Sequence, residues 1–75
     1  MATMRLDLRG LNCPEPVLRA SRAIREVEIG DALVLECTDP LTTIDIPLFV
    51  SRAGHLLERQ ERQDGLLVFT IVRSK

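Results

Sequence analysis

The sequence predicts an α+β fold, a two-layer sandwich in which two helices cover one face of a four-stranded mixed sheet. Two kinds of periodicity support this prediction: alternating apolar and polar residues are typical of strands, and apolar residues three and four apart are typical of helices. Strands are expected over residues 3–9, 32–38, 55–62 and 66–72, and helices over residues 14–28 and 41–53. In this βαβαββ order, right-handed crossovers make the first two strands parallel and place both helices on the same side of the sheet.

The first strand and helix are the best-marked elements. Three apolar residues alternate with three charged ones in the strand: Met4, Leu6 and Leu8 against Arg5, Asp7 and Arg9. Proline is tolerated in a helix only within its first turn. Pro14 and Pro16 therefore fix the helix start to within about a residue, with Cys13 at or next to the N-cap. Apolar residues then recur at helical spacing up to about Glu28, and Gly30-Asp31 stops the helix: these are Val17, Ala20, Ile24 and Val27.

The second half of the chain contains one ambiguous element. Asp39-Pro40 breaks the chain after the second strand, and residues 41–53 form a helix that ends at Gly54. Pro47 falls inside this helix, so the helix either starts late, with Thr43 as its cap, or bends at the proline. The strand over 55–62 has few apolar residues. Asp64-Gly65 is a strong hairpin turn, and residues 66–72 follow as the most strand-like segment.

Length, composition and charge narrow the possible functions. Seventy-five residues are expected to form one domain, 1–75, with little room for a deep pocket. A net charge of −1 and an aromatic content of 3% argue against direct binding of nucleic acid. No apolar segment has the length of a signal or transmembrane helix, so a cytoplasmic protein with no membrane contact is expected. We also expect a monomer without metal or cofactor.

Cys13 is the residue most suggestive of chemistry. It follows the carboxyl end of the first strand, which is the edge where active groups gather in parallel sheets. At a helix start, the helix dipole is expected to lower the pKa of its thiol below the usual value of about 8.5 and favour the thiolate. The alternative is that Cys13 is a small buried side chain, because free cysteines are among the most buried residues.

Other candidate residues fit ordinary structural roles. Cys37 shares a strand face with Leu33 and Leu35, which favours core packing over a role as the disulfide or resolving partner of Cys13. The only histidine, His55, is expected at the opposite end of the sheet from Cys13, so a Cys–His pair is not indicated. A zinc site is not indicated either, because one ligand is missing.

Charged residues follow the first helix next to Cys13. Arg19, Arg22 and Arg25 form a basic stripe, partly balanced by glutamates at i,i+4 spacing. Such a stripe is either a solvated face or a rim that steers an acidic partner, and Arg19 and Arg22 are the candidates for docking.

Two motifs together resemble the TusA (SirA-like) family of sulfur-carrier proteins. The first is Leu8 to Val17, which contains Cys13-Pro14-Glu15-Pro16. The second is similar to the family stretch D-P-x-T-x-x-D-I-P-x-F and runs from Asp39 to Phe49, including Asp45 and Pro47. Length and element order agree, so the resemblance covers almost the whole chain.

The resemblance implies both an architecture and a function. The fourth strand would be antiparallel to the others and inserted between the second and third. Cys13 would be the catalytic residue, supported by Pro14, Glu15 and Pro16, with Asp45 and Pro47 as possible docking residues. It would accept sulfane sulfur as a persulfide from a cysteine desulfurase or rhodanese and pass it to a cysteine of an acceptor protein. A sulfurtransferase component is therefore expected, although the sequence does not indicate the pathway. The alternative is a non-catalytic binding or regulatory module that uses the same surface.

Overall fold

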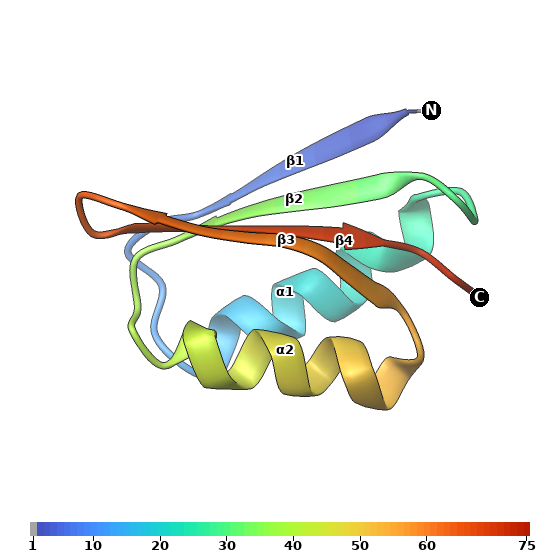
Figure 1. The fold of residues 1–75 in the computed structure, drawn as a ribbon. Coiled ribbons are helices and arrows are strands. Elements are labelled where there is room, and N and C mark those ends of the chain that lie inside the picture. Colours follow the sequence, from blue (N-terminus) through green and yellow to red (C-terminus); the bar gives the residue numbers. More distant parts are fainter. Residues whose placement is uncertain (1) are drawn as a thin grey trace.

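The computed structural model describes residues 2–75 and has the predicted order of elements (Figure 1). The elements are β1 (Thr3–Leu8), α1 (Glu15–Ala23), the 3-10 turn η1 (Ile24–Glu26), β2 (Ala32–Cys37), α2 (Thr42–Ala53), β3 (Leu56–Gln63) and β4 (Leu66–Val72). In the four-stranded sheet the strand order is β1-β2-β4-β3. β1 and β2 are parallel, and β4 is antiparallel to β2 and to β3. The predicted α+β fold and the inserted fourth strand are both confirmed.

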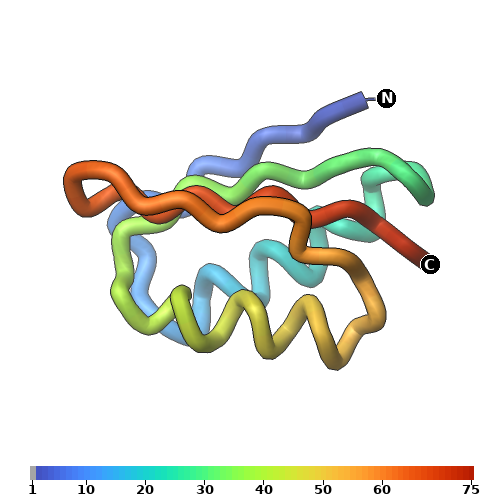
Figure 2. Tube along the Cα trace, in the orientation of Figure 1, coloured from blue at the N-terminus to red at the C-terminus, as the bar shows by residue number. Residues whose placement is uncertain are grey.

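Both helices lie on one side of the sheet, as Figures 1 and 2 show. The core fills the space between the two layers, because each strand turns alternate residues toward the helices. Its fully buried sheet residues include Leu8, Leu33, Leu35, Phe69 and Ile71, and its buried helix residues include Ala20, Ile24, Ile46 and Val50. The first turns of α1 and α2 meet at the end of the sheet where β1 and β2 finish (Figure 1).

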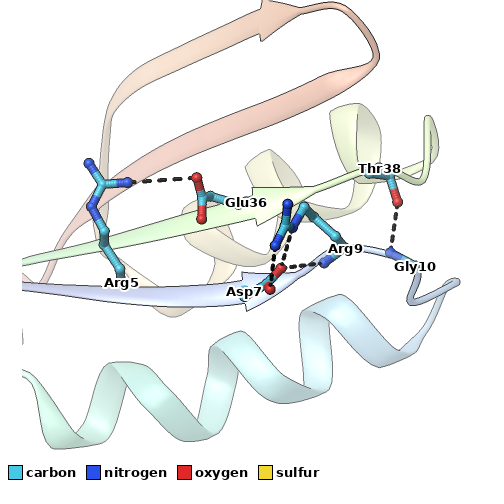
Figure 3. Close-up of polar contacts among 6 residues, drawn as sticks. All are labelled: Arg5, Asp7, Arg9, Gly10, Glu36 and Thr38. Atoms are coloured by element: carbon cyan, nitrogen blue, oxygen red, sulfur yellow. Dashed lines mark hydrogen bonds and ion pairs between the residues drawn. The ribbon is translucent and has the colours of Figure 1, made fainter.

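The opposite sheet face is polar on the β1–β2 side. Arg5 pairs with Glu36 across the two strands at 3.7 Å, and Asp7 pairs with Arg9 at 2.9 Å (Figure 3). Such exposed pairs contribute little to stability. These charged side chains lie on the face of the sheet that the helices leave uncovered.

The first helix is shorter than predicted. The α-helix ends at Ala23 and tightens into η1, and Val27 is already extended at φ −89° and ψ 138°. The Arg73 guanidinium donates to the carbonyl oxygens of Arg25 and Val27 at 3.2 and 2.7 Å, so tertiary contacts satisfy groups that a longer helix would have used. Val27 stays buried in this geometry. Val27 therefore matches the helical spacing of apolar residues in the sequence, although it lies outside the helix.

The second helix resolves the ambiguity at Pro47. It runs continuously from Thr42 to Ala53 with Leu41 as N-cap, so the late start with Thr43 as cap is wrong. Asp39 stabilises the earlier start, because its Oδ1 accepts the Leu41 N–H at 3.0 Å. The helix ends at Gly54, whose φ of +79° is the left-handed conformation that glycine adopts without strain.

The third strand, predicted from a segment with few apolar residues, is present as β3 and lies at the edge of the sheet. β3 pairs with β4 along most of its length, with an irregularity between Leu57 and Arg59. The Asp64-Gly65 turn sets this pairing, so the strand forms with few buried side chains. Among residues 2–75, no helix has the length and apolar character needed to cross a membrane.

Candidate functional site: the Cys13 groove

Cys13 lies in the loop between β1 and α1, immediately before the N-cap residue Pro14. Its side chain is exposed, as predicted, and the alternative of a packed cysteine is wrong. The loop is tied to the end of β2 by a hydrogen bond from the Gly10 N–H to Thr38 Oγ1 at 2.9 Å (Figure 3). Leu8 and Cys37 are paired in the β1–β2 register, so this loop leaves the sheet beside the loop that leads to α2.

Two carboxylates hold Cys13 in place. The backbone N–H of Cys13 donates to Asp39 Oδ2 at 2.8 Å, and its thiol donates to Asp45 Oδ2, also at 2.8 Å. Asp39 follows β2, and Asp45 lies in the first turn of α2. The contacts therefore come from segments 26 and 32 residues away in the chain.

The electrostatics of the thiol differ from the expectation. The pKa of Cys13 is raised above its ordinary value, mainly because the Asp45 carboxylate accepts a hydrogen bond from the protonated thiol. Partial desolvation and the negative charges of Asp45 and Asp39 act in the same direction. The predicted lowering by the helix dipole is wrong because this dipole effect is small beside a carboxylate in direct contact.

Cys13 borders an open groove of about 570 Å³ between the two helices. We call it the Cys13 groove; it is lined by Cys13, Pro14, Val17, Asp45, Leu48, Phe49, Arg52 and Ala53. Most of these side chains are apolar, with Asp45 near the sulfur and one cation, Arg52. The groove is open rather than deep, which agrees with the expectation of little room for a deep pocket.

The structure brings together only some of the predicted site residues. Pro14 and Asp45 line the groove with Cys13, whereas Pro16 is buried in the first turn of α1. The other four do not line it: Glu15, Arg19 and Arg22 are exposed on α1, and Pro47 is half-buried on α2.

Three features of the groove and its surroundings were missed in the sequence. Asp39 was interpreted as a chain break and as the first residue of the second motif, but not as a contact of Cys13, and Arg52 was not singled out. The third is an apolar row that starts at the N-cap of α2 and continues along the helix: Leu41, Ile44 and Leu48 are 52%, 63% and 45% exposed. Its spacing of three and four residues is the helical signal that could have revealed it, because a second apolar stripe outside the core face indicates a contact surface.

The other candidate residues, Cys37 and His55, do not line the Cys13 groove. Cys37 is fully buried and free, which confirms its predicted core role, and burial raises its pKa to about 11. His55 precedes β3 at the opposite end of the sheet, as predicted, and its Nδ1 accepts the Ser74 N–H. Burial and the positive charges of Arg73 and Lys75 lower the pKa of His55. Within residues 2–75, no three His, Cys, Asp or Glu side chains form a cluster that could hold a metal ion.

Comparisons with known proteins agree with the architecture and the motifs. The family model for sulfurtransferase TusA matches residues 4–73. The sulfur carrier protein TusA of Pseudomonas entomophila is 42% identical over 66 residues, covering 88% of this chain and 82% of its own. The sulfur carrier protein TusA of Pseudomonas putida is 41% identical over 66 residues, and the match covers the same shares of the two chains, 88% and 82%.

A solved structure has the same fold along nearly the whole chain. The crystal structure of a SirA-like protein from Desulfitobacterium hafniense matches with a TM-score of 0.82 and 26% identity, covering 96% of this chain and 99% of that one. The family match, the relatives and the shared fold agree with the two motifs around Cys13 and Asp45. This chain belongs to the TusA sulfurtransferase family.

Proposed function

We propose that this protein is a sulfur carrier that accepts sulfane sulfur as a persulfide on Cys13 and passes it to a cysteine of an acceptor protein. The observation that carries the proposal is an exposed thiol at the edge of an open, mainly apolar groove, in a chain of the TusA family. The relatives named as sulfur carrier proteins support the same role. Residues 1–75 would act as one carrier domain, working as a monomer in the cytoplasm, where its thiols stay reduced.

The proposed reaction is an exchange between sulfur atoms and needs no bound cofactor. The Cys13 thiolate attacks the terminal sulfur of a donor persulfide, forming a new S–S bond as the donor S–S bond breaks. The donor sulfur leaves as a thiolate and takes up a proton. Cys13–SH and donor S–SH thus become Cys13–S–SH and donor SH, without a separate oxidant. A second exchange of the same kind delivers the sulfur to the acceptor.

The partners follow from this chemistry. A cysteine desulfurase or a rhodanese would supply the sulfane sulfur, and the acceptor must present a thiol that fits the groove. In this role the protein is a sulfurtransferase component that acts as a protein co-substrate. Arg19 and Arg22 lie exposed on α1, the helix that begins next to the cysteine, where their charges would steer an acidic partner surface.

The proposal is tested by mass spectrometry after incubation with a cysteine desulfurase and L-cysteine. The wild type should gain the mass of one sulfur atom on the peptide that contains Cys13. Cys13→Ser should gain none and remain folded, because the site is exposed and serine can still donate to Asp45. Cys37→Ala is the matched control and should accept sulfur normally. A Cys13→Ser protein that still carries sulfur, or a wild type that carries none, would contradict the role; the latter result would favour a non-catalytic binding module.

A further inference from the structure

The contact between Cys13 and Asp45 conflicts with simple sulfur exchange. The attacking form in such an exchange is the thiolate, not the thiol. Yet Asp45 accepts a hydrogen bond from the protonated thiol at 2.8 Å, and a second carboxylate, Asp39, binds the backbone N–H of the same residue. A thiolate at this position would face two negative charges. The free protein therefore favours the unreactive form of its own nucleophile.

Within the part of the chain that the structure describes, no cation forms an ion pair with either carboxylate. The ion pairs among residues 2–75 involve Arg5, Arg9 and Arg59, and none reaches Asp39 or Asp45. The charged groups that contact Cys13 are those two aspartates, from the loop after β2 and from α2. Arg52 lies further along the groove, and Glu15, in the first turn of α1, is exposed and does not line it. The raised pKa of Cys13 agrees with this excess of negative charge.

The surrounding surface indicates what could change this balance. The groove walls beside Asp45 are apolar, from Pro14 and Val17 on α1 to Leu48 and Phe49 on α2. A protein segment that fills the groove would exclude water from around Asp45. A carboxylate deprived of water needs a counter-charge, which makes a cationic side chain the complementary group for this position.

We propose that Asp45 restrains the Cys13 thiol in its protonated form and that a sulfur donor releases it by placing a basic side chain against Asp45 in the Cys13 groove. This inference rests on the proposed sulfur-carrier function. An ion pair between Asp45 and the partner removes the repulsion that opposes the thiolate. The Cys13 proton then leaves to solvent, the thiolate attacks the terminal sulfur of the donor persulfide, and the departing donor thiolate takes up a proton. Transfer would thus be fast only in the correct complex.

The first test measures alkylation of Cys13 by iodoacetamide as a function of pH, without any sulfur donor. Asp45→Asn removes the charge but keeps an oxygen that can accept the thiol hydrogen bond. The pH midpoint of labelling should move down relative to the wild type. Every tenfold gain in thiolate fraction should raise the rate at pH 7 about three- to fourfold, because the more acidic thiolate is also less nucleophilic. We expect at least a threefold faster rate.

Two control variants separate this effect from a general loss of charge or structure. Glu28→Gln removes one negative charge from an exposed residue at the opposite end of the sheet, and its labelling profile should match the wild type. Asp45→Glu keeps the charge and should stay closer to the wild type than Asp45→Asn. An unchanged or slower rate in Asp45→Asn would overturn the proposal, since it would mean that Asp45 does not restrain the thiol.

The second test measures sulfur transfer from a cysteine desulfurase to the same variants. Asp45→Asn should accept sulfur at least threefold more slowly than the wild type, despite its faster alkylation, because the contact with the partner cation is lost. Faster transfer in this variant would overturn the role of the partner. If the wild type forms no persulfide, the proposed function fails, and the alkylation profile still decides whether Asp45 restrains the thiol.

Discussion

Alkaline pH should destabilise this protein through Cys37. The thiol is fully buried in the fold, where its pKa rises from 9.0 to about 11, while the unfolded chain exposes it to water. Burial favours the protonated thiol, so its contribution to stability is fully present below pH 9. It is lost as the pH rises from 9 to 11, because the unfolded state releases the proton first.

The size of this loss follows from the two pKa values. A difference of about two pKa units, at about 1.4 kcal/mol per unit, corresponds to about 2–3 kcal/mol. A domain of this length has a free energy of unfolding of roughly 4–11 kcal/mol, so the loss is a large fraction of it. Urea unfolding between pH 8 and pH 11 under reducing conditions measures the change.

Cys37→Ala is the matched control, because it keeps every other group of the wild type that titrates at alkaline pH. At pH 8 the variant should be less stable by about 1 kcal/mol, since it loses one buried sulfur atom. Between pH 9 and pH 11 its free energy of unfolding should fall by about 2–3 kcal/mol less than that of the wild type. Parallel pH curves for the two proteins would refute the reasoning.

Three further predictions concern the thiols, the basic stripe and the end of α2. Iodoacetamide should label Cys13 roughly four orders of magnitude faster than Cys37, because labelling of Cys37 requires unfolding that costs about 5 kcal/mol or more; comparable rates would contradict the placement of the thiols. Charge reversal at Arg19 and Arg22 should slow sulfur transfer and weaken its salt dependence without lowering Tm, whereas identical salt curves would indicate a solvated face. Gly54→Ala should lower the free energy of unfolding by about 1 kcal/mol, because alanine is strained at a φ of +79°; unfolding in urea checks this, and an unchanged value would argue against the left-handed cap.

The elements of the fold could be predicted because local patterns and tertiary packing agree in most of the chain. The alternation that ends at Leu8 and the prolines before α1 describe the same geometry that the core requires. Local reasoning was wrong where a distant group intervenes. Arg73 lies 48 and 46 residues from Arg25 and Val27, whose carbonyl oxygens it binds where the first helix has already ended. At the second helix the missed signal is local instead: Asp39 binds the N–H of Leu41, two residues further along the chain.

The same limit applies to the site. Cys13 could be identified from its neighbours in the chain, since a cysteine before two prolines is a local feature. The Asp45 contact depends on how α2 is placed against the loop before α1, a separation of 32 residues that no local periodicity encodes. The pKa of Cys13 was therefore predicted in the wrong direction: the helix dipole was visible in the sequence, and the carboxylate that outweighs it was not.

Asp39 also has a consequence for the motions of the site. Its Oδ1 accepts the Leu41 N–H at the start of α2, and its Oδ2 accepts the Cys13 N–H. A single side-chain rotation would break both hydrogen bonds at once, so the two loops share one local opening event. Amide hydrogen exchange at Cys13 and Leu41 should consequently report nearly the same opening free energy, although the residues belong to different elements. The peptide that carries the thiol is thus only as rigid as the first turn of the neighbouring helix.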